Sequence, residues 1–187
     1  MSRPIEFNRD QALNAAMKLF WRQGYVATSM NQLLQVMKIS RSSFYAGFVD
    51  KRSVFVESLN LFSLRTRNLL LLDFDSDSPL TSVRAFFDKT TFDIPQWRIN
   101  AGCMMVNTIL ELADVDPELS HLAAERLNRI ELDFVDLFKN KMQDPVSAAS
   151  VVMTLNKGIR VSSRTGASAA ELDRTISATL KLLEQAA

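Results

Sequence analysis

Residues 28–51 contain two short helix patterns separated by a brief break, and this arrangement constrains the fold more than any other feature of the chain. Ser29 is a favourable N-cap for the first helix, because Gln32 stands three residues later, as a capping box requires. Apolar side chains then recur at helical spacing at Met30, Leu33, Leu34 and Met37. After the break, Ser40 is the N-cap candidate of a second helix that runs through residues 41–45. Two short helices joined by a tight turn predict a helix-turn-helix.

The second helix of this pair carries side chains suited to reading DNA in the major groove. Arg41 presents a planar fork of donors for guanine, and Ser42 and Ser43 are short hydrogen-bonding residues. The hydroxyl of Tyr45 can reach a phosphate, and a phosphate partner would explain why Lys51 opposes the dipole of the next helix. The predicted DNA-binding residues are Thr28, Ser29, Arg41, Ser42, Ser43, Tyr45 and Lys51. The alternative is a helical hairpin that touches no DNA.

The distribution of charge along the chain supports a nucleic-acid partner. Residues 1–70 contain ten Lys and Arg against four Asp and Glu, a net charge of +6, whereas residues 71–187 carry a net charge of −5. A basic third on a nearly neutral protein is typical of a polyanion-binding module. The polar arm at residues 1–8 contains Arg3, and such basic arms can enter a minor groove.

The same region resembles the TetR family of bacterial transcriptional repressors. The resemblance rests on Phe20, Gly24, Tyr25, Thr28 and Ser29, on Ile39 through Tyr45, and on Phe48, Asp50 and Lys51. After the tyrosine, the family often has an aromatic residue and a histidine or tyrosine, where this chain has Ala46 and Gly47. The resemblance implies a homodimer that binds double-stranded operator DNA. It also implies release when a small-molecule effector tilts the helix at residues 50–72.

The whole chain is predicted to be all-α, with about nine helices. One helix is expected from Asn8 to Gln23, with Gly24 at its end, and Gly47 is expected to end the second helix of the helix-turn-helix in a left-handed conformation. Further helices are expected at 50–72, from 79 to before Pro95, at 97–112, at 118–138, at 145–164 and from 168 onward. The helix at 97–112 is apolar on nearly all sides, which predicts a central, buried position.

Two domains follow from this pattern. Residues 1–50 are expected to form the helix-turn-helix DNA-binding domain. Residues 51–187 are expected to form a helical-bundle domain for ligand binding and dimerisation, with 51–72 as the connecting helix. The acidic stretch at 73–79 is expected to be a loop.

Apolar side chains with one polar group predict a small-molecule site in the second domain. The expected ligand-binding residues are Phe62, Phe86, Trp97, Cys103, Met104, Asn107 and Phe134. The expected effector is a small apolar or amphipathic molecule, although each of these residues alone is more often plain core. Cys103 is expected to be a buried structural thiol with a raised pKa. The alternative is a repressor that senses oxidants or electrophiles through Cys103.

The last two helices are predicted to form the subunit interface. Small residues alternate there with Val, Leu and Ile, which permits close helix approach, and the family resemblance implies a four-helix bundle with a second subunit. The predicted interface residues are Val152, Leu155, Ile159, Ile176, Leu180 and Leu183. The alternative is that these helices only complete the core of one subunit.

Several other classes of protein are disfavoured by the sequence. A single cysteine and a single histidine argue against a disulfide, a metal cluster or a histidine-based catalytic site. Three alternating aspartates at 73–77 lack the glycine and closing glutamate of a calcium loop. We therefore expect no catalytic residue, cofactor or metal. Without an apolar run of about 18 residues, no membrane span is expected and the cytoplasm is favoured. The remaining alternative is a helical enzyme or scaffold that does not bind DNA.

Overall fold

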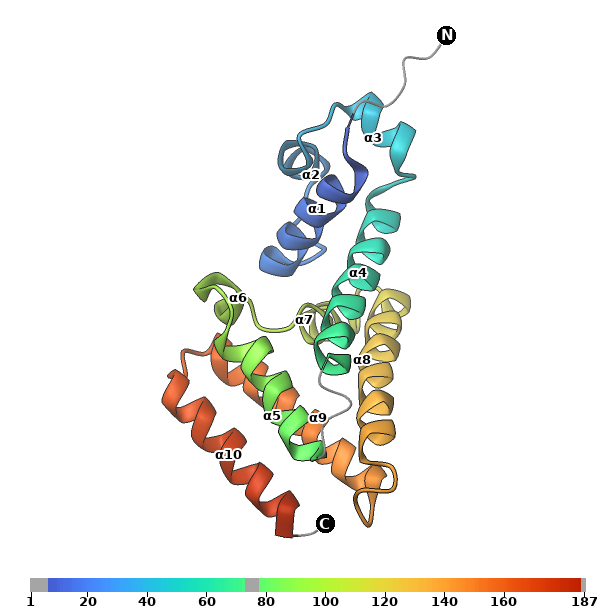
Figure 1. Cartoon of the computed structure of the whole chain (residues 1–187). Helices are drawn as coiled ribbons and strands as arrows, with labels where there is room; N and C mark the ends of the chain where they lie inside the picture. The colour runs from blue at the N-terminus through green and yellow to red at the C-terminus, as the bar shows by residue number, and fades with distance from the viewer. Residues whose placement is uncertain (1–6, 73–77, 186–187) are drawn as a thin grey trace.

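The fold is all-α, as the sequence predicts. The computed structural model describes residues 7–72 and 78–185, apart from the side chains of Gln96 and Ile99. Figure 1 shows the helices that these ranges contain: α1 (Arg9–Gln23), α2 (Met30–Met37), α3 (Arg41–Gly47), α4 (Lys51–Leu71), α5 (Pro79–Phe87), the π-helical η1 (Asp88–Phe92), α6 (Gln96–Ala101), α7 (Met104–Leu112), α8 (Pro117–Phe138), α9 (Pro145–Arg164) and α10 (Ala169–Gln185). Arg3 and the aspartates of the predicted acidic loop lie outside the described residues.

The helices of the helix-turn-helix begin at the predicted places because polar side chains cap them. The Ser29 hydroxyl accepts from the backbone N–H of Gln32, whose side chain accepts in turn from the Ser29 N–H, which completes the capping box. Ser40 caps α3, and Asp50 caps α4. These caps satisfy backbone donors that the first turn of a helix leaves without a partner.

The left-handed residue of the helix-turn-helix lies at a different position from the one predicted. The left-handed residue lies after α2, where Lys38 has a φ of 56°. Gly47 was expected to be left-handed, and this prediction is wrong, because Gly47 is the last helical residue of α3. The backbone N–H of Phe48 donates to the Phe44 carbonyl at 2.7 Å, so helical bonding continues past the glycine.

Helix α4 connects the upper and lower parts of the molecule in Figure 1. It packs against α1 and against α8. On the α1 side, Phe20 meets Phe55 edge to face, with ring centroids 4.9 Å apart. On the α8 side, Arg67 donates to both carboxylate oxygens of Asp133, at 2.5 and 2.8 Å. Helix α4 therefore links α1 to α8 through side-chain contacts on two sides.

The single helix expected at 97–112 is wrong, because the chain breaks between α6 and α7. Gly102 has a left-handed φ of 67°, and Cys103 is extended with a φ of −113°. The Gly102 carbonyl accepts a hydrogen bond from Trp21 Nε1 at 3.2 Å. A Cβ at Gly102 would lie 3.2 Å from the backbone oxygen of Arg160. Glycine therefore permits both the turn and the close approach of α9.

Helix α7 packs mainly against α8 and also contacts the turn between α1 and α2. It is less buried than expected, since Leu110 is 71% exposed. The Glu111 carboxylate accepts from the backbone N–H groups of Tyr25 at 3.0 Å and Val26 at 2.8 Å. Gly24 precedes them with a φ of 87°. We refer to these contacts of Glu111 with residues 24–26 as the Glu111 bridge.

Candidate nucleic-acid interface and internal cavity

Helix α3 lies at the end of the molecule opposite the C-terminus (Figure 1). Phe44 is completely buried and fixes the inner face of the helix. Arg41 and Ser42 are exposed, Ser43 is half-buried, and Tyr45 is 55% exposed. The Tyr45 ring lies edge-on against Phe44, with centroids 5.3 Å apart, which holds the tyrosine on the outer face. This face has the size and chemistry of an element that enters a major groove.

Thr28 and Ser29 stabilise the start of α2. Thr28 is only 1% exposed, and its hydroxyl donates to the Gly24 carbonyl at 2.6 Å. The same hydroxyl accepts from Gln23 Nε2 at 3.0 Å. Ser29 is exposed, but its hydroxyl is the N-cap of α2. These contacts give Thr28 a structural role in the α1–α2 turn and leave Ser29 at the surface.

Two of the cations predicted to contact DNA have partners within the chain. Arg41 Nη2 donates to Asn31 Oδ1 at 3.3 Å, and both residues are exposed. Lys51 Nζ lies 4.3 Å from the centroid of the Tyr25 ring. Burial lowers the pKa of Lys51, while the Glu111 carboxylate opposes that shift. The position of Lys51 in the first turn of α4 is thus explained within the chain by a cation–π contact.

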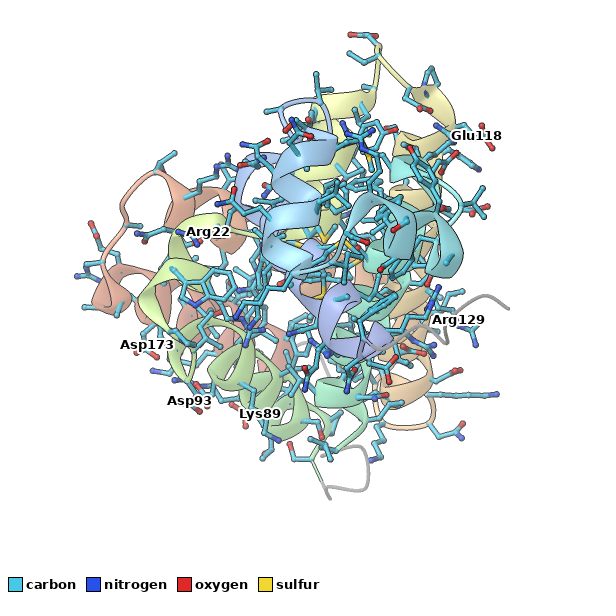
Figure 2. All side chains as sticks on the ribbon, turned by 90° about the horizontal axis from the view of Figure 1, so that it is seen from above. Arg22, Lys89, Asp93, Glu118, Arg129 and Asp173 are labelled. Carbon is cyan, nitrogen blue, oxygen red and sulfur yellow. The ribbon has the colours of Figure 1, made fainter. Side chains whose placement is uncertain are left out.

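The surface around α2 and α3 carries no acidic side chain from its own segment. Residues 11–49 contain no Asp or Glu, and they include four Lys or Arg residues. Seen from above in Figure 2, the helix-turn-helix occupies the centre of the view, whereas Asp93, Glu118 and Asp173 project at the periphery. A polyanion approaching from this side therefore meets little electrostatic repulsion.

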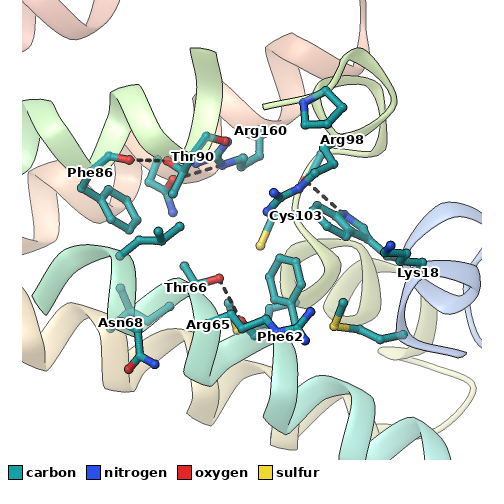
Figure 3. A pocket seen from close by; sticks show the side chains of 18 of the residues that line it. Lys18, Phe62, Arg65, Thr66, Asn68, Phe86, Thr90, Arg98, Cys103 and Arg160 are labelled. Carbon is teal, nitrogen blue, oxygen red and sulfur yellow. Dashed lines mark hydrogen bonds between the residues drawn. The ribbon is translucent and has the colours of Figure 1, made fainter. Parts of the chain in front are cut away.

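A cavity of about 520 Å³ that is partly open to solvent lies between α1, α4, α5, α6 and α9 (Figure 3). Its volume falls within the range of about 300–1,000 Å³ that is usual for small-molecule sites. The apolar part of its wall consists of Met17, Trp21, Phe62, Leu69, Phe86, Pro95, Trp97, Met105 and Ile130. Helix α1 supplies Met17, Lys18 and Trp21, so the first helix of the DNA-binding region is part of the cavity wall.

The residues predicted to bind a ligand are divided among three places. Phe62, Phe86, Trp97 and Cys103 line the cavity. Met104 and Phe134 are buried but do not line it. Asn107 lies at a neighbouring hollow of about 720 Å³, and its side chain donates to the Ala101 carbonyl at 2.8 Å. The break at Gly102 explains this separation, because it removes Asn107 from the helix that carries Trp97.

Four cations that are not among the predicted ligand-binding residues also line the cavity: Lys18, Arg65, Arg98 and Arg160. They come from α1, α4, α6 and α9, so no local pattern brings them together. One signal was available, because Asn156 and Arg160 occupy positions on α9 beside apolar residues of its buried face. Polar residues at core positions need partners, and a ligand can supply them.

The two innermost guanidinium groups have no acidic partner in the part of the chain that the structure describes. Among the described residues, Arg160 donates to the neutral acceptors Thr90 O and Oγ1 at 2.6 Å each and to Asn156 Oδ1 at 3.2 Å. Burial lowers the pKa of Arg160, the Cys103 thiol opposes this shift, and the charge of Arg98 adds to it. Burial also lowers the pKa of Arg98, with a further contribution from Arg65. The cavity therefore holds positive charges that repel one another.

Comparisons with known proteins agree with the arrangement of these helices. The model of the family described as bacterial regulatory proteins, tetR family, matches residues 12–57, which contain most of α1, all of α2 and α3, and the start of α4. The HTH-type transcriptional repressor ComR of Escherichia coli (strain K12) is 26% identical over 190 residues, covering 96% of this chain and 90% of ComR. The chain belongs to the TetR family of transcriptional regulators.

Solved structures of TetR family regulators share the whole fold. A regulator from Cytophaga hutchinsonii superposes with a TM-score of 0.84 at 16% identity, covering 100% of this chain and 98% of its own. A cysteine mutant of the TetR family regulator CifR, complexed with 26-bp double-strand operator DNA, superposes with a TM-score of 0.70 at 25% identity, covering 97% and 100%. The family consists of transcriptional regulators and not of enzymes, so this TetR family protein is a DNA-binding repressor.

Cys103 of this TetR family regulator is buried at the start of α7. It is 5% exposed and occupies the N-cap position of that helix. Burial raises the pKa of the Cys103 thiol, while the backbone N–H of Val106 and the charge of Arg160 act in the opposite direction. A raised pKa disfavours the thiolate, which is the reactive form of cysteine.

The residues predicted for the subunit interface lie mostly in the core of one chain. Val152, Ile159, Ile176 and Leu183 are buried without any partner subunit, and Leu155 and Leu180 are half-buried. These side chains pack among α5, α8, α9 and α10. The exposed faces of α9 and α10 carry Val151, Thr154, Gly158 and Val161, and Ala178 and Leu182, respectively.

The described part of the chain contains neither a cluster of metal-binding side chains nor a membrane-spanning helix. No group of three or more His, Cys, Asp or Glu residues there is arranged to hold a metal ion. None of its helices is both long enough and apolar enough to span a bilayer.

Proposed function

We propose that this TetR family repressor is a homodimer that leaves its operator when a small amphipathic molecule occupies the internal cavity. The observation that carries this proposal is that α1 and α4 both contribute to the cavity wall. Helix α1 packs against α2, and α4 follows α3 directly in the chain. A molecule that changes the spacing between these walls therefore changes the position of the helix-turn-helix.

The proposed domains separate DNA binding from effector binding and dimerisation. Residues 1–50 read DNA, residues 51–187 bind the effector and the second subunit, and the helix at 51–72 connects the two. In the bound state α3 lies in the major groove. There Arg41 contacts guanine, Ser42 contacts a neighbouring base edge, and the Tyr45 hydroxyl contacts a phosphate. Ser29, at the N-terminus of α2, contacts the backbone. A repressor of this type acts where the chromosome is, in the bacterial cytoplasm.

Two contacts support a direct route from the cavity to the DNA-binding helices. The Trp21 indole, which lines the cavity, bonds to the Gly102 carbonyl. The Glu111 bridge attaches the turn between α1 and α2 to α7. A ligand that binds more tightly when these contacts shift will move the population away from the DNA-binding arrangement.

The second subunit is proposed to cover the faces of α9 and α10 that a single chain leaves exposed. Small and apolar residues on these faces, Gly158 and Ala178 among them, permit close approach of helices. An operator with two-fold symmetry needs two DNA-binding domains, which a homodimer provides.

The proposal is tested with an operator selected from random duplexes by the purified protein. Sedimentation should show a dimer that binds this operator with strong salt dependence. Leu182→Arg introduces a charge at a side chain that is 67% exposed, and should give a folded monomer with weak operator binding. Leu132→Arg on α8, at a side chain that is 45% exposed, is the matched control and should remain a dimer. A dimeric Leu182→Arg variant with normal operator binding contradicts the proposed interface.

Sensing through Cys103 is the second candidate, since this thiol lines the cavity. Its raised pKa favours the structural role. The sensing hypothesis requires that peroxide or an electrophile release wild-type protein from the operator while Cys103→Ala stays bound. Release of both proteins by the same non-covalent effector supports the structural role.

A further inference from the structure

We propose that the effector is an amphipathic organic anion, a carboxylate attached to an apolar aromatic or aliphatic body. This inference rests on the proposed function, which assigns the cavity to the effector, and adds the sign of its charge. Among the described residues that line the cavity, four are cationic and none is Asp or Glu. Complementarity of charge therefore favours an anion and disfavours a cation.

The strongest support is the condition of Arg160. Its side chain lies at the inner wall, the residue is 9% exposed, and the bonds that it donates within the described residues go to uncharged oxygens of Thr90 and Asn156. A buried charge is costly unless an opposite charge accompanies it. The neutral acceptors orient the guanidinium, and the compensating negative charge is left for a ligand to supply.

Arg98 provides a second donor in the same part of the cavity. Its Nε is buried and has no hydrogen-bond partner within the described residues. Its guanidinium lies 5.1 Å from the centroid of the Trp21 ring, so the aromatic face orients this side chain. Figure 3 shows Arg98 and Arg160 on the same side of the cavity, opposite Phe62 and Thr66 of α4.

Four other arginines of the described chain are paired with acids, whereas exposed arginines such as Arg41 and Arg65 bond to asparagine oxygens. Arg9 meets Glu57, Arg52 meets Asp116, Arg67 meets Asp133, and Arg84 meets Asp88. The chain thus has enough acidic residues to pair arginines where structure requires it. Arg160 differs from those exposed arginines because it is buried without an acid beside it among the described residues, which favours this wall as a receptor for an external anion.

The apolar wall determines the rest of the ligand. The Trp21 ring meets Phe62 and Trp97 edge to face, at centroid distances of 4.7 and 5.4 Å, and these rings offer a surface for an apolar body. A carboxylate suits the planar donor fork of a guanidinium, because two parallel hydrogen bonds can form. A small inorganic anion would leave the aromatic wall without a partner.

The experiment compares three molecules that differ only in the head group: 4-phenylbutanoate, its uncharged amide and 4-phenylbutylamine. Both tryptophans of the chain line the cavity, so intrinsic fluorescence reports binding directly. The acid should bind at least about tenfold more tightly than the amide, and the amine should bind most weakly. Inorganic phosphate at equal concentration should not displace the acid. Absence of saturable binding by the acid, or binding no tighter than that of the amide, overturns the inference.

Variants identify the responsible charge. Arg98→Gln should weaken binding of the acid by about tenfold while leaving the amide within about twofold. Arg129→Gln removes the same charge at an exposed position on α8 and should change neither affinity. Equal losses for acid and amide in Arg98→Gln would show that Arg98 only shapes the cavity, which contradicts the inference.

Operator binding separates this inference from the proposed function. Release of the operator by the acid supports both. Preferential binding of the acid without release supports the anionic site and contradicts its role as effector site. Release by the amide or the amine, but not by the acid, supports ligand response and overturns the anionic class.

Discussion

Where α4 meets α8, Arg67 donates two hydrogen bonds to Asp133, whereas at the cavity wall Arg160 donates three to uncharged oxygens. Both arginines lie largely inside the molecule, and both hold elements together that are distant in sequence. The difference is the counter-charge, which the described residues supply at the first place and not at the second. A completed pair fixes two helices, while an incomplete one leaves binding energy for a molecule that arrives later.

The largest effect is expected when the completed pair is broken. The Asp133 side chain is 8% exposed, so Asp133→Ala leaves Arg67 charged and without a partner between α4 and α8. The free energy of unfolding should fall by about 3 kcal/mol, measured by urea denaturation. The double variant Arg67→Leu with Asp133→Leu should recover much of this loss, because it buries no charge. If Asp133→Ala were as stable as wild type, the Arg67–Asp133 pair would not stabilise the fold, and the contrast with Arg160 at the cavity wall would be lost.

A third kind of arginine lies on the DNA-binding face, where the proposed partner is a base. Arg41→Ala should weaken binding to the selected operator by about 1–3 kcal/mol and relax specificity at one position. Its stability should stay within about 0.5 kcal/mol of wild type, because Arg41 is exposed. Fluorescence anisotropy on operator and random duplexes measures the difference. Equal weakening on both would limit Arg41 to phosphate contact.

The pair of Arg52 with Asp116 tests a partly exposed version of the completed pair. Hydrogen bonding to Arg52 lowers the pKa of Asp116 below its usual value. Its contribution to stability is therefore present above that usual value and is lost as the pH falls through the lowered pKa. Asp116→Asn keeps an N-cap for α8 and should cost only about 0.5–1 kcal/mol at neutral pH.

The stability difference between Asp116→Asn and wild type should narrow as the solution becomes acidic. Urea denaturation at several pH values follows this change. A difference that does not depend on pH would show that the variant perturbs packing and not the ion pair.

The smallest effect on stability is expected at the cavity. Arg98→Gln removes a charge that has no acidic partner within the described ranges, so the free energy of unfolding should change by less than about 0.5 kcal/mol or increase slightly. Thermal unfolding without and with 4-phenylbutanoate checks this. The acid should stabilise wild type more than the variant. A loss comparable to that of Asp133→Ala would show that Arg98 is structural.

Helix positions were predictable to the extent that the signals are local. Ser29, Ser40 and Asp50 bond to backbone groups three residues away, and such caps can be read directly from the sequence. The break at Gly102 depends instead on Trp21 and on the backbone of α9, which are distant in sequence. A glycine within an apolar helical pattern does not by itself predict a break, because helices tolerate it.

The cavity was predictable only in its apolar part. Aromatic residues such as Phe62 and Trp97 suggest a ligand site by type, without regard to their neighbours. The positive charge of the wall depends on Lys18, Arg98 and Arg160 being brought together from α1, α6 and α9. That convergence is a property of tertiary packing and has no signature at any single position.

Gly24 was expected only as the end of a helix, yet the Glu111 bridge gives it a second constraint. Its φ of 87° disfavours any side chain, and a Cβ there would lie 2.5 Å from Glu111 Oε2. The same missing side chain that lets α1 stop also leaves room for a carboxylate from a helix far along the chain. The glycine that ends α1 therefore also makes room for a long-range contact, and no residue type with a side chain meets both requirements.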